Sequence, residues 1–306
     1  MFGILNRWVL NSVLAFFFIF LSACPQGSVA LEAPAHNTPV QVLMVVANDG
    51  FFFQEYFDPW KELETAGIEI EVASGLGGTA TPHPGSYHNH KNSQNDYPEG
   101  VVPLEADRTL SSTLILSQQS AQDYDALVIV GGWGAARYYY DYPGVMDESL
   151  STWAPNSLES SEMNRLIGEF LTAQKPVMGV CNGVNVLSWA RIEGTSPLNG
   201  VSVSAPWGSA FPQSYPNPYP NGVLTAYTSD WTIDGACGET PAPNCFPMDQ
   251  FAKDNGAIIR DDSTRLDPQG HARDSVYTVD GLIVTVQDNF AARAAGKYLA
   301  QRLLAP

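Results

Sequence analysis

Short apolar runs, each closed by a turn sequence, divide the first part of the chain into strand and helix candidates. Residues 40–47 are almost wholly apolar and end at an Asn-Asp-Gly sequence, the pattern of a buried strand followed by a turn. Residues 54–66 carry apolar side chains at helical spacing, and Gly67 follows as a C-terminal cap. Residues 68–74 form a second strand. The pattern predicts a strand-helix-strand unit, from which parallel sheets are built.

The same alternation returns after a long interval. Residues 75–122 are rich in Gly, Pro, His, Asn and Ser and predict a surface excursion with a short strand or helix near its end, long enough to serve as a lid. A buried strand follows over residues 124–132 and ends in two glycines, which let the backbone turn sharply and approach a ligand. Helical spacing then covers residues 160–173, a strand covers 176–180, and a helix covers 183–190.

The C-terminal part completes a single domain. Two short strands surround an Asp-Gly turn within residues 276–286, which is a hairpin signal. A last helix covers residues 290–304, with Asp288 and Asn289 as capping candidates. No internal repeat is visible. The pattern therefore predicts one flavodoxin-like α/β domain over residues 40–306, with a mostly parallel sheet flanked by helices.

The first residues of the chain favour export. Arg7 supplies a short positive region, and residues 8–21 are almost wholly apolar, as in a secretory signal peptide. A membrane-spanning anchor is the alternative interpretation. The apolar run is shorter, however, than the roughly 20 residues that cross a bilayer, so the signal peptide is favoured.

The sequence LSAC that ends in Cys24 resembles the lipobox of bacterial lipoproteins. The resemblance implies that residues 1–23 form a signal peptide and that Cys24 becomes a lipidated N-terminus. Two or three acyl chains are enough for stable anchoring. Residues 24–39 are rich in Pro and Ala and are expected to be a tether. The domain would then face the periplasm or the cell exterior, attached to the membrane through its lipid alone.

Charge excludes two classes of partner. The chain has 32 acidic and 15 basic residues and a formal net charge of −17. Such a balance argues against nucleic acid, and against adhesion to anionic lipid through a basic patch. Because 44% of the residues are hydrophobic, the chain can still bury a substantial core.

The four cysteines fit an oxidising compartment. Cys237 and Cys245 lie in one turn-rich segment and are predicted to form a disulfide; two separate buried thiols are the alternative. With Cys24 assigned to lipid, Cys181 is left alone. An unpaired thiol is a liability in an oxidising compartment unless it is protected or used.

Cys181 falls between the strand over residues 176–180 and the helix over residues 183–190. Such a position is typical of a nucleophile elbow, and glycines on both sides of the cysteine suit a sharp turn. A helix N-terminus presents free N–H groups and a positive dipole end, which predict a depressed pKa for the thiol. A buried core cysteine is the alternative.

Separated pieces of the sequence resemble the ThiJ/PfpI family of the class I glutamine-amidotransferase-like superfamily, in the order in which that family has them. They are an acidic residue, Glu55, at the start of the first helix, the strand that ends at Gly132, the segment KPVMGVCNG around Cys181, and the last strand DGLIVT. The resemblance covers residues 40–304. Each motif alone is weak, and the ordered set is fairly specific.

The resemblance implies a site and an activity. Glu55 would lie against the sulfur of Cys181, and the N–H groups of Gly132 and Asn182 would form an oxyanion hole. The expected function is that of a cysteine-dependent hydrolase or lyase, acting on a small aldehyde, ketoaldehyde, amide or isonitrile. No cofactor is expected, and family members commonly form homodimers. His83, His88 and His90 are interpreted as part of a solvated loop rather than a metal site.

Asn182 stands where many members of this family have a histidine, so the usual neighbouring acid or base is missing. His271 is the only histidine after Cys181; it is a weak candidate for a general base and is more simply a surface residue. Asp230, Glu239 and Asp249 are weaker candidates still. Cys-Asn-Gly also occurs in some glutamine amidotransferases, but these need a later His-Glu pair that is absent here.

Two other functions remain open at this stage. Cys181 could oxidise reversibly as a redox sensor, with Glu55 stabilising the product. The fold could also serve ligand binding without chemistry, because catalytic scaffolds are often reused in that way.

The lipid anchor is testable by metabolic labelling. Cells that express the full chain are expected to incorporate a labelled fatty acid into it, because the lipobox directs a diacylglyceryl group to Cys24. A wild-type chain without label would contradict the lipoprotein interpretation.

Overall fold

The computed structural model describes residues 39–82, 86, 108–143, 154–206, 249–260 and 277–305. By contacts the chain divides into Met1–Ala35 and His36–Pro306, and every described residue belongs to the second unit. Several predicted features lie outside the described residues: the signal peptide, Cys24 and the tether up to residue 38, His83, His88, His90 and His271, Cys237 and Cys245, Asp230 and Glu239.

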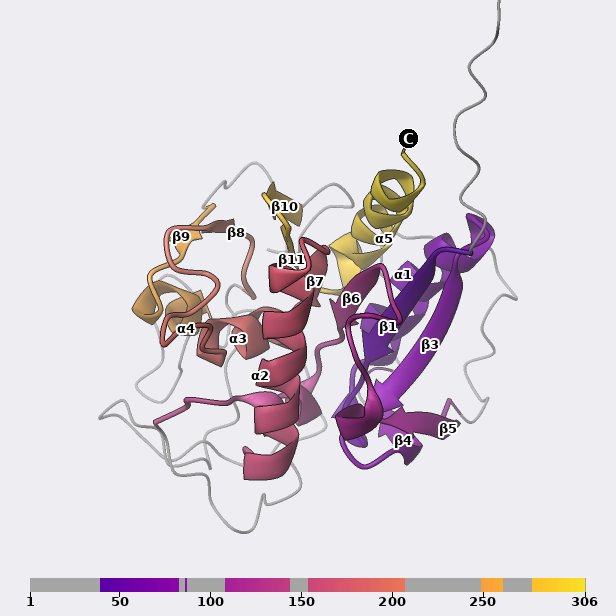
Figure 1. The fold of residues 1–306 in the computed structure, drawn as a ribbon, viewed down its shortest axis with the longest axis horizontal. Coiled ribbons are helices and arrows are strands. Elements are labelled where there is room, and N and C mark those ends of the chain that lie inside the picture. The colour runs from indigo at the N-terminus through magenta and orange to yellow at the C-terminus, as the bar shows by residue number, and fades with distance from the viewer. Residues whose placement is uncertain are drawn as a thin grey trace, which may run out of the picture. The chain divides into compact units, whose positions relative to one another are not determined.

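Among the described residues, one sheet has the strand order β10-β11-β7-β6-β1-β3-β5-β4-β2 (Figure 1). Its strands are β1 (Gln41–Val45), β2 (Asp49–Phe51), β3 (Glu69–Ser74), β4 (Gly78–Pro82), β5 (Leu110–Ile115), β6 (Ala126–Ile129), β7 (Val177–Val180), β10 (Tyr277–Asp280) and β11 (Ile283–Val286). The strands from β11 to β5 are parallel, whereas β10 and β4 run antiparallel to β11 and β5. Numbered along the chain, the run β3-β1-β6-β7-β11 has the flavodoxin order 2-1-3-4-5. The predicted fold class is confirmed.

Helices cover both faces of this sheet (Figure 1). They are α1 (Phe53–Thr65), α2 (Ser157–Thr172), α3 (Asn182–Trp189), α4 (Asp249–Asp254) and α5 (Asn289–Leu304), with 3₁₀ turns η3 (Leu116–Gln118) and η4 (Trp133–Tyr138). A separate parallel pair joins β8 (Ser202–Val203) to β9 (Ile258–Ile259). No helix in the described part of the chain is long and apolar enough to cross a membrane.

The side chains of β1 alternate between two apolar clusters. Leu43 and Val45 pack with residues of α2 and α3, whereas Val42 and Met44 pack with residues of α1 and α5. Strands buried on both faces need apolar residues at every position. This requirement explains why the central strands were recognisable as continuous apolar runs.

The structure differs from the sequence prediction at one edge of the sheet. The predicted excursion contains β4 and β5, and residues 49–51 form β2 rather than only a turn. Thr113 alone is buried in β5, so this strand shows neither alternation nor an apolar run. Pairing of its backbone with β3 and β4 holds it in place instead.

The sheet has a switch point between β1 and β6, because the chain proceeds from β1 to β3 on one side and returns to β6 on the other. Ligands in such sheets bind beyond the carboxyl ends of the strands at this point. Gly131 and Gly132 follow β6 at this edge, and Cys181 follows β7. The segment that leads from β1 into α1 lies beside them, since Phe52 donates its N–H to the carbonyl of Gly131 at 3.2 Å.

Two glycines let the β7-to-α3 turn lie tightly against β6. A Cβ atom on Gly183 would overlap the carbonyl oxygen of Ile129 in β6. A Cβ atom on Gly179 would lie 2.9 Å from the carbonyl oxygen of Gly183. Backbone atoms cannot move aside as a flexible side chain can, so this turn requires glycine at both positions.

We expect Gly183→Ala to lower the free energy of unfolding by about 1–3 kcal/mol, because the added methyl group forces β6 and α3 apart. The matched control is Gly168→Ala in α2, whose Cβ would meet only the end of the Ile192 side chain, at 3.1 Å. Urea unfolding of both variants measures the difference. Equal stability of the two variants would contradict the close packing of the turn.

Candidate active site

Cys181 occupies a strained turn between β7 and α3. Its backbone angles are φ 49° and ψ −117°, and a non-glycine residue in such a sparsely populated region costs about 1–3 kcal/mol. Its N–H donates to the carbonyl of Val286 in β11 at 2.8 Å, and its carbonyl accepts from the N–H of Val184 at 2.9 Å. The residue keeps some exposed surface and forms no disulfide. The predicted strand-to-helix elbow is confirmed.

Glu55 lies in the first turn of α1, and its side chain hydrogen-bonds with the thiol of Cys181. Only 1% of Glu55 is exposed. Gly131 makes room for the carboxyl, since a Cβ atom there would overlap Oε2 of Glu55 and would lie 2.8 Å from the backbone nitrogen of Asn182. The structure therefore brings together Glu55, Cys181, Asn182 and the loop after β6.

Burial raises the pKa of Glu55 well above its usual range, because water no longer stabilises the charged carboxylate. The negative charges of Asp288 and Asp58 add to this effect, whereas the contacts with Cys181 and the N–H of Gly131 oppose it. Within the described residues, the carboxylate oxygen Oε2 of Glu55 is buried and has no hydrogen-bond partner of ordinary geometry. Glu55 therefore holds a proton to a higher pH than an exposed glutamate does.

The predicted depression of the Cys181 pKa is wrong. Burial raises the pKa of the thiol well above its usual range, and the charge and hydrogen bond of Glu55 raise it further. The N–H of Asn182 acts in the opposite direction and is outweighed. Sequence reasoning counted the helix N-terminus but not the carboxylates that surround the sulfur. Protonation of Glu55 removes the main negative charge facing the thiol.

The two predicted oxyanion donors are the backbone N–H groups of Gly132 and Asn182. The backbone N–H of Asn182 contacts the sulfur of Cys181. Gly132 has φ 90°, in the region that favours glycine, and a Cβ atom there would lie 2.5 Å from the carbonyl oxygen of Gly50. No hydrogen bond of the Gly132 N–H is found in the ranges that the structure describes. It is a buried donor with its hydrogen-bonding capacity unused.

The side chain of Asn182 is fully engaged inside the protein. Its Nδ2 donates to the carbonyl of Gly132 at 2.9 Å. Its Oδ1 accepts from Nδ2 of Asn185 at 3.1 Å and from the hydroxyl of Tyr139. An amide held in this way, with 1% of the residue exposed, cannot replace a histidine as a base.

The sequence also suggested Asp249 and the aromatic residues after Gly132 as parts of the site. Asp249 is buried at the start of α4, where it forms an ion pair with Lys253 at 2.6 Å. The aromatic residues after Gly132 serve mainly as core: Trp133, Tyr138 and Tyr139 are buried, and only Tyr140 is exposed. Within the described ranges no group of three His, Cys, Asp or Glu residues could hold a metal ion.

Sequence reasoning missed Asp288 as part of the site. Asp288 lies two residues after the end of β11 and raises the pKa of both Glu55 and Cys181 through its charge. The signal was available, because residues at the carboxyl ends of parallel strands meet at one edge of the sheet. Its position before the last helix suggested only a capping role.

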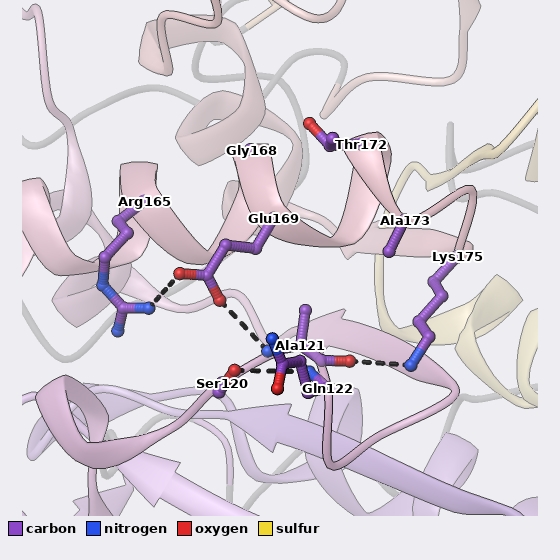
Figure 2. A pocket seen from close by; sticks show the side chains of 9 residues that line it. All are labelled: Ser120, Ala121, Gln122, Arg165, Gly168, Glu169, Thr172, Ala173 and Lys175. Atoms are coloured by element: carbon purple, nitrogen blue, oxygen red, sulfur yellow. Dashed lines mark hydrogen bonds and ion pairs between the residues drawn. The ribbon is translucent and has the colours of Figure 1, made fainter.

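A hollow lies at the end of β7 opposite Cys181 and has a volume of about 620 Å³. Figure 2 shows several of its lining residues bonded to one another, among them Glu169 with the backbone of Ala121. Nζ of Lys175 donates to the carbonyls of Ala121 and Tyr124, and Arg165 forms an ion pair with Glu169. These contacts fasten α2 and β7 to the start of β6.

Comparison with known proteins identifies the fold. No protein-family model matches the sequence, and no curated protein matches it. A ThiJ/PfpI domain protein from Brachyspira murdochii matches with a TM-score of 0.51 and 18% identity, covering 87% of this chain and 98% of that chain. Glyoxalase III from Candida albicans matches with a TM-score of 0.52 and 15% identity, over 85% and 95% of the two chains. DJ-1beta from Drosophila melanogaster gives 0.50 and 15%, over 87% and 91%. The chain has the fold of the ThiJ/PfpI proteins.

We expect Glu55→Gln to raise the free energy of unfolding at pH 8 and to have less effect near pH 5. The pKa of Glu55 is raised in the folded state, so its stabilising contribution is complete below the unfolded pKa of about 4.3 and is lost as pH rises through the folded value. Wherever the carboxyl of Glu55 is ionised, the variant avoids a buried charge, a gain of about 1 kcal/mol or more.

Thermal unfolding of the wild type and Glu55→Gln at several pH values between 5 and 8 measures this trend. Glu64→Gln is a suitable control, because Glu64 is exposed and its ion pair among the described residues is with its helix neighbour Lys61. A Glu55→Gln effect that did not change with pH would contradict a titration of Glu55 between pH 5 and pH 8.

Proposed function

We propose that this protein is a cysteine-dependent enzyme of the ThiJ/PfpI type that uses Cys181 on a small electrophilic substrate. One observation carries the proposal: a strained, partly exposed cysteine whose thiol hydrogen-bonds with a buried carboxyl of raised pKa. Strain of this kind persists only where surrounding structure enforces it, and it concentrates at functional sites. A core cysteine needs neither the strain nor a carboxyl beside it.

In the proposed first step, the sulfur of Cys181 forms a bond to the carbonyl carbon and the carbonyl π electrons move to its oxygen. The thiol proton passes to the carboxylate of Glu55 and from there to the new oxyanion, which gives a thiohemiacetal with an aldehyde. No atom is lost in this addition. A raised pKa suits Glu55 to this task, because a more basic carboxylate accepts the thiol proton more readily.

The N–H groups of Gly132 and Asn182 are proposed to stabilise the oxyanion. Support comes from the unused donor of Gly132 and from the position of the Asn182 N–H beside the sulfur. Donors held in place before the reaction need not reorganise as charge develops. Removal of one such donor typically lowers turnover by about 10²- to 10³-fold.

Carbonyl compounds are the substrate class we favour, and ketoaldehydes are the first to test because one protein of the same fold is named a glyoxalase III. Amides and isonitriles are the other classes that the sequence resemblance suggests. A hydrolase or a lyase is consistent with the same first bond.

Redox sensing is a weaker candidate. Peroxide reacts with the thiolate rather than the thiol. Because burial and the charge of Glu55 raise the pKa of Cys181, little thiolate forms at neutral pH. In attack on a carbonyl carbon with a general base, the thiol loses its proton during the attack, so a thiolate need not form beforehand.

We also propose that the enzyme acts outside the inner membrane, anchored through a lipid on Cys24. The apolar leader and the LSAC sequence support this location. The net charge of −17 is compatible with an anchor that depends on lipid rather than on a basic patch.

The decisive comparison tests methylglyoxal, a small amide and a small isonitrile on the wild type, Cys181→Ser and Glu55→Gln. We expect turnover of one class by the wild type, none by Cys181→Ser, and a loss of about 10²-fold or more in Glu55→Gln, because the proton acceptor is gone.

Alkylation by iodoacetamide at pH 7 should show the opposite trend. Glu55→Gln should be labelled at Cys181 faster than the wild type, because removal of the carboxylate lowers the pKa of the thiol. Turnover that survived both substitutions would overturn the mechanism.

A further inference from the structure

Three buried polar side chains meet behind the elbow. Tyr139 is 1% exposed, Asn182 is 1% exposed and Asn185 is fully buried. The hydroxyl of Tyr139 and Nδ2 of Asn185 both donate to Oδ1 of Asn182, and Nδ2 of Asn182 donates to the carbonyl of Gly132. The orientation of the Asn182 amide follows from its partners, because the carbonyl of Gly132 can only accept. We call this group, formed by Tyr139, Asn182 and Asn185, the Tyr139 cluster.

The Tyr139 cluster binds the carbonyl of Gly132, and the residue before α1 binds the carbonyl of Gly131. The peptide that carries the Gly132 N–H also contains the carbonyl of Gly131, which accepts from the N–H of Phe52 at 3.2 Å. C=O and N–H point in opposite directions in a planar trans peptide. The Gly132 donor therefore points away from Phe52, while Asn182 fixes the next peptide through the Gly132 carbonyl at 2.9 Å.

Asn182 also supplies the second donor. Its own N–H contacts the sulfur of Cys181, and its side chain reaches the carbonyl of Gly132. A single residue thus links the two donors, and its side chain cannot rotate away while Tyr139 and Asn185 hold Oδ1. Tyr139 is itself fixed by T-shaped contacts with Tyr142 and Phe251, at ring-centroid distances of 5.6 and 6.0 Å.

We propose that Tyr139 is a positioning residue that sets the spacing of the oxyanion donors by holding the side chain of Asn182. The inference rests on the proposed function, since it assumes that the N–H groups of Gly132 and Asn182 face the developing oxyanion. Tyr139 contacts the site through the hydrogen bond from its hydroxyl to Oδ1 of Asn182. It acts through Asn182, which explains why a buried amide follows the cysteine in this chain.

The test compares two reagents for Cys181. Iodoacetamide alkylates the sulfur without forming an oxyanion, whereas methylglyoxal adds through one. We expect Tyr139→Phe to be alkylated within about twofold of the wild type. Its methylglyoxal adduct, followed by intact-mass measurement, should form at least about tenfold more slowly than that of the wild type. This slowing should be smaller than the 10²- to 10³-fold loss expected when an oxyanion donor is deleted.

Tyr142→Phe is the matched control. It removes a hydroxyl from the same aromatic cluster, and Tyr142 forms no hydrogen bond within the described residues. Its behaviour should match that of the wild type toward both reagents. Asn185→Ala provides a second variant, with a smaller loss expected because Tyr139 still holds Asn182; thermal unfolding confirms that each variant is folded.

The outcomes separate the two proposals. A Tyr139→Phe variant that forms the adduct at the wild-type rate would overturn the positioning role alone. An equal loss of alkylation and adduct formation would also overturn it, because a general disturbance of the site would then explain both. A wild type that is alkylated but forms no adduct would overturn addition to carbonyl compounds, the favoured form of the proposed function, together with the positioning role.

Discussion

The position of one buried carboxyl beside one thiol depends on how α1 is held against the sheet. Glu55 is in the first turn of α1, so any shift of this helix separates it from Cys181. α5 prevents such a shift: Gly296 packs so closely that a Cβ atom there would lie 2.5 Å from Cα of Pro59. Nδ2 of Asn289 also donates to Oε1 of Gln54 at 2.9 Å in the interior. The C-terminal helix thus fixes the proton-holding group of the site.

Burying Glu55 is unfavourable in itself, and the apolar cluster around α1 and α5 offsets it. Isolated carboxylates lose their hydration when buried, and they respond by holding a proton. The same clustering of carboxylates raises the pKa of Cys181, so both members of the pair are protonated more readily than in water. Such a pair titrates as a unit, so its pKa values belong to the pair and not to either residue. Its chemistry is therefore described by the position of the proton that Glu55 and Cys181 share.

Most of the fold could be predicted because the central strands are buried on both faces. β1, β6 and β7 are continuous apolar runs for that reason, and turn residues mark their ends. β4 at the sheet edge could not be predicted and β5 was indicated only as a short strand or helix, since backbone pairing rather than apolar pattern holds both strands. The apolar pattern of a segment reflects which of its side chains are buried, so an edge strand with one buried residue shows little pattern.

The site was only partly predictable from sequence. The turn around Cys181 followed from the strand and helix patterns on either side, whereas the pairing with Glu55 came from a resemblance and not from spacing. The direction of the thiol pKa could not be obtained locally, because it depends on Glu55 and Asp288, which are distant in sequence. Likewise, Tyr139 is 43 residues from Asn182, and nothing near either residue marks them as partners.

The amide that follows Cys181 changes how proton transfer must be organised in this site. A histidine there could exchange protons with the substrate, whereas the Asn182 side chain is committed to Gly132, Tyr139 and Asn185. Our proposal therefore assigns proton exchange with the thiol to Glu55, which hydrogen-bonds with it. An environment that raises the pKa of this carboxyl makes it a better proton acceptor. In the proposed mechanism, the burial that makes Glu55 costly to the fold is thus the property that lets its ionised form accept a proton without a histidine.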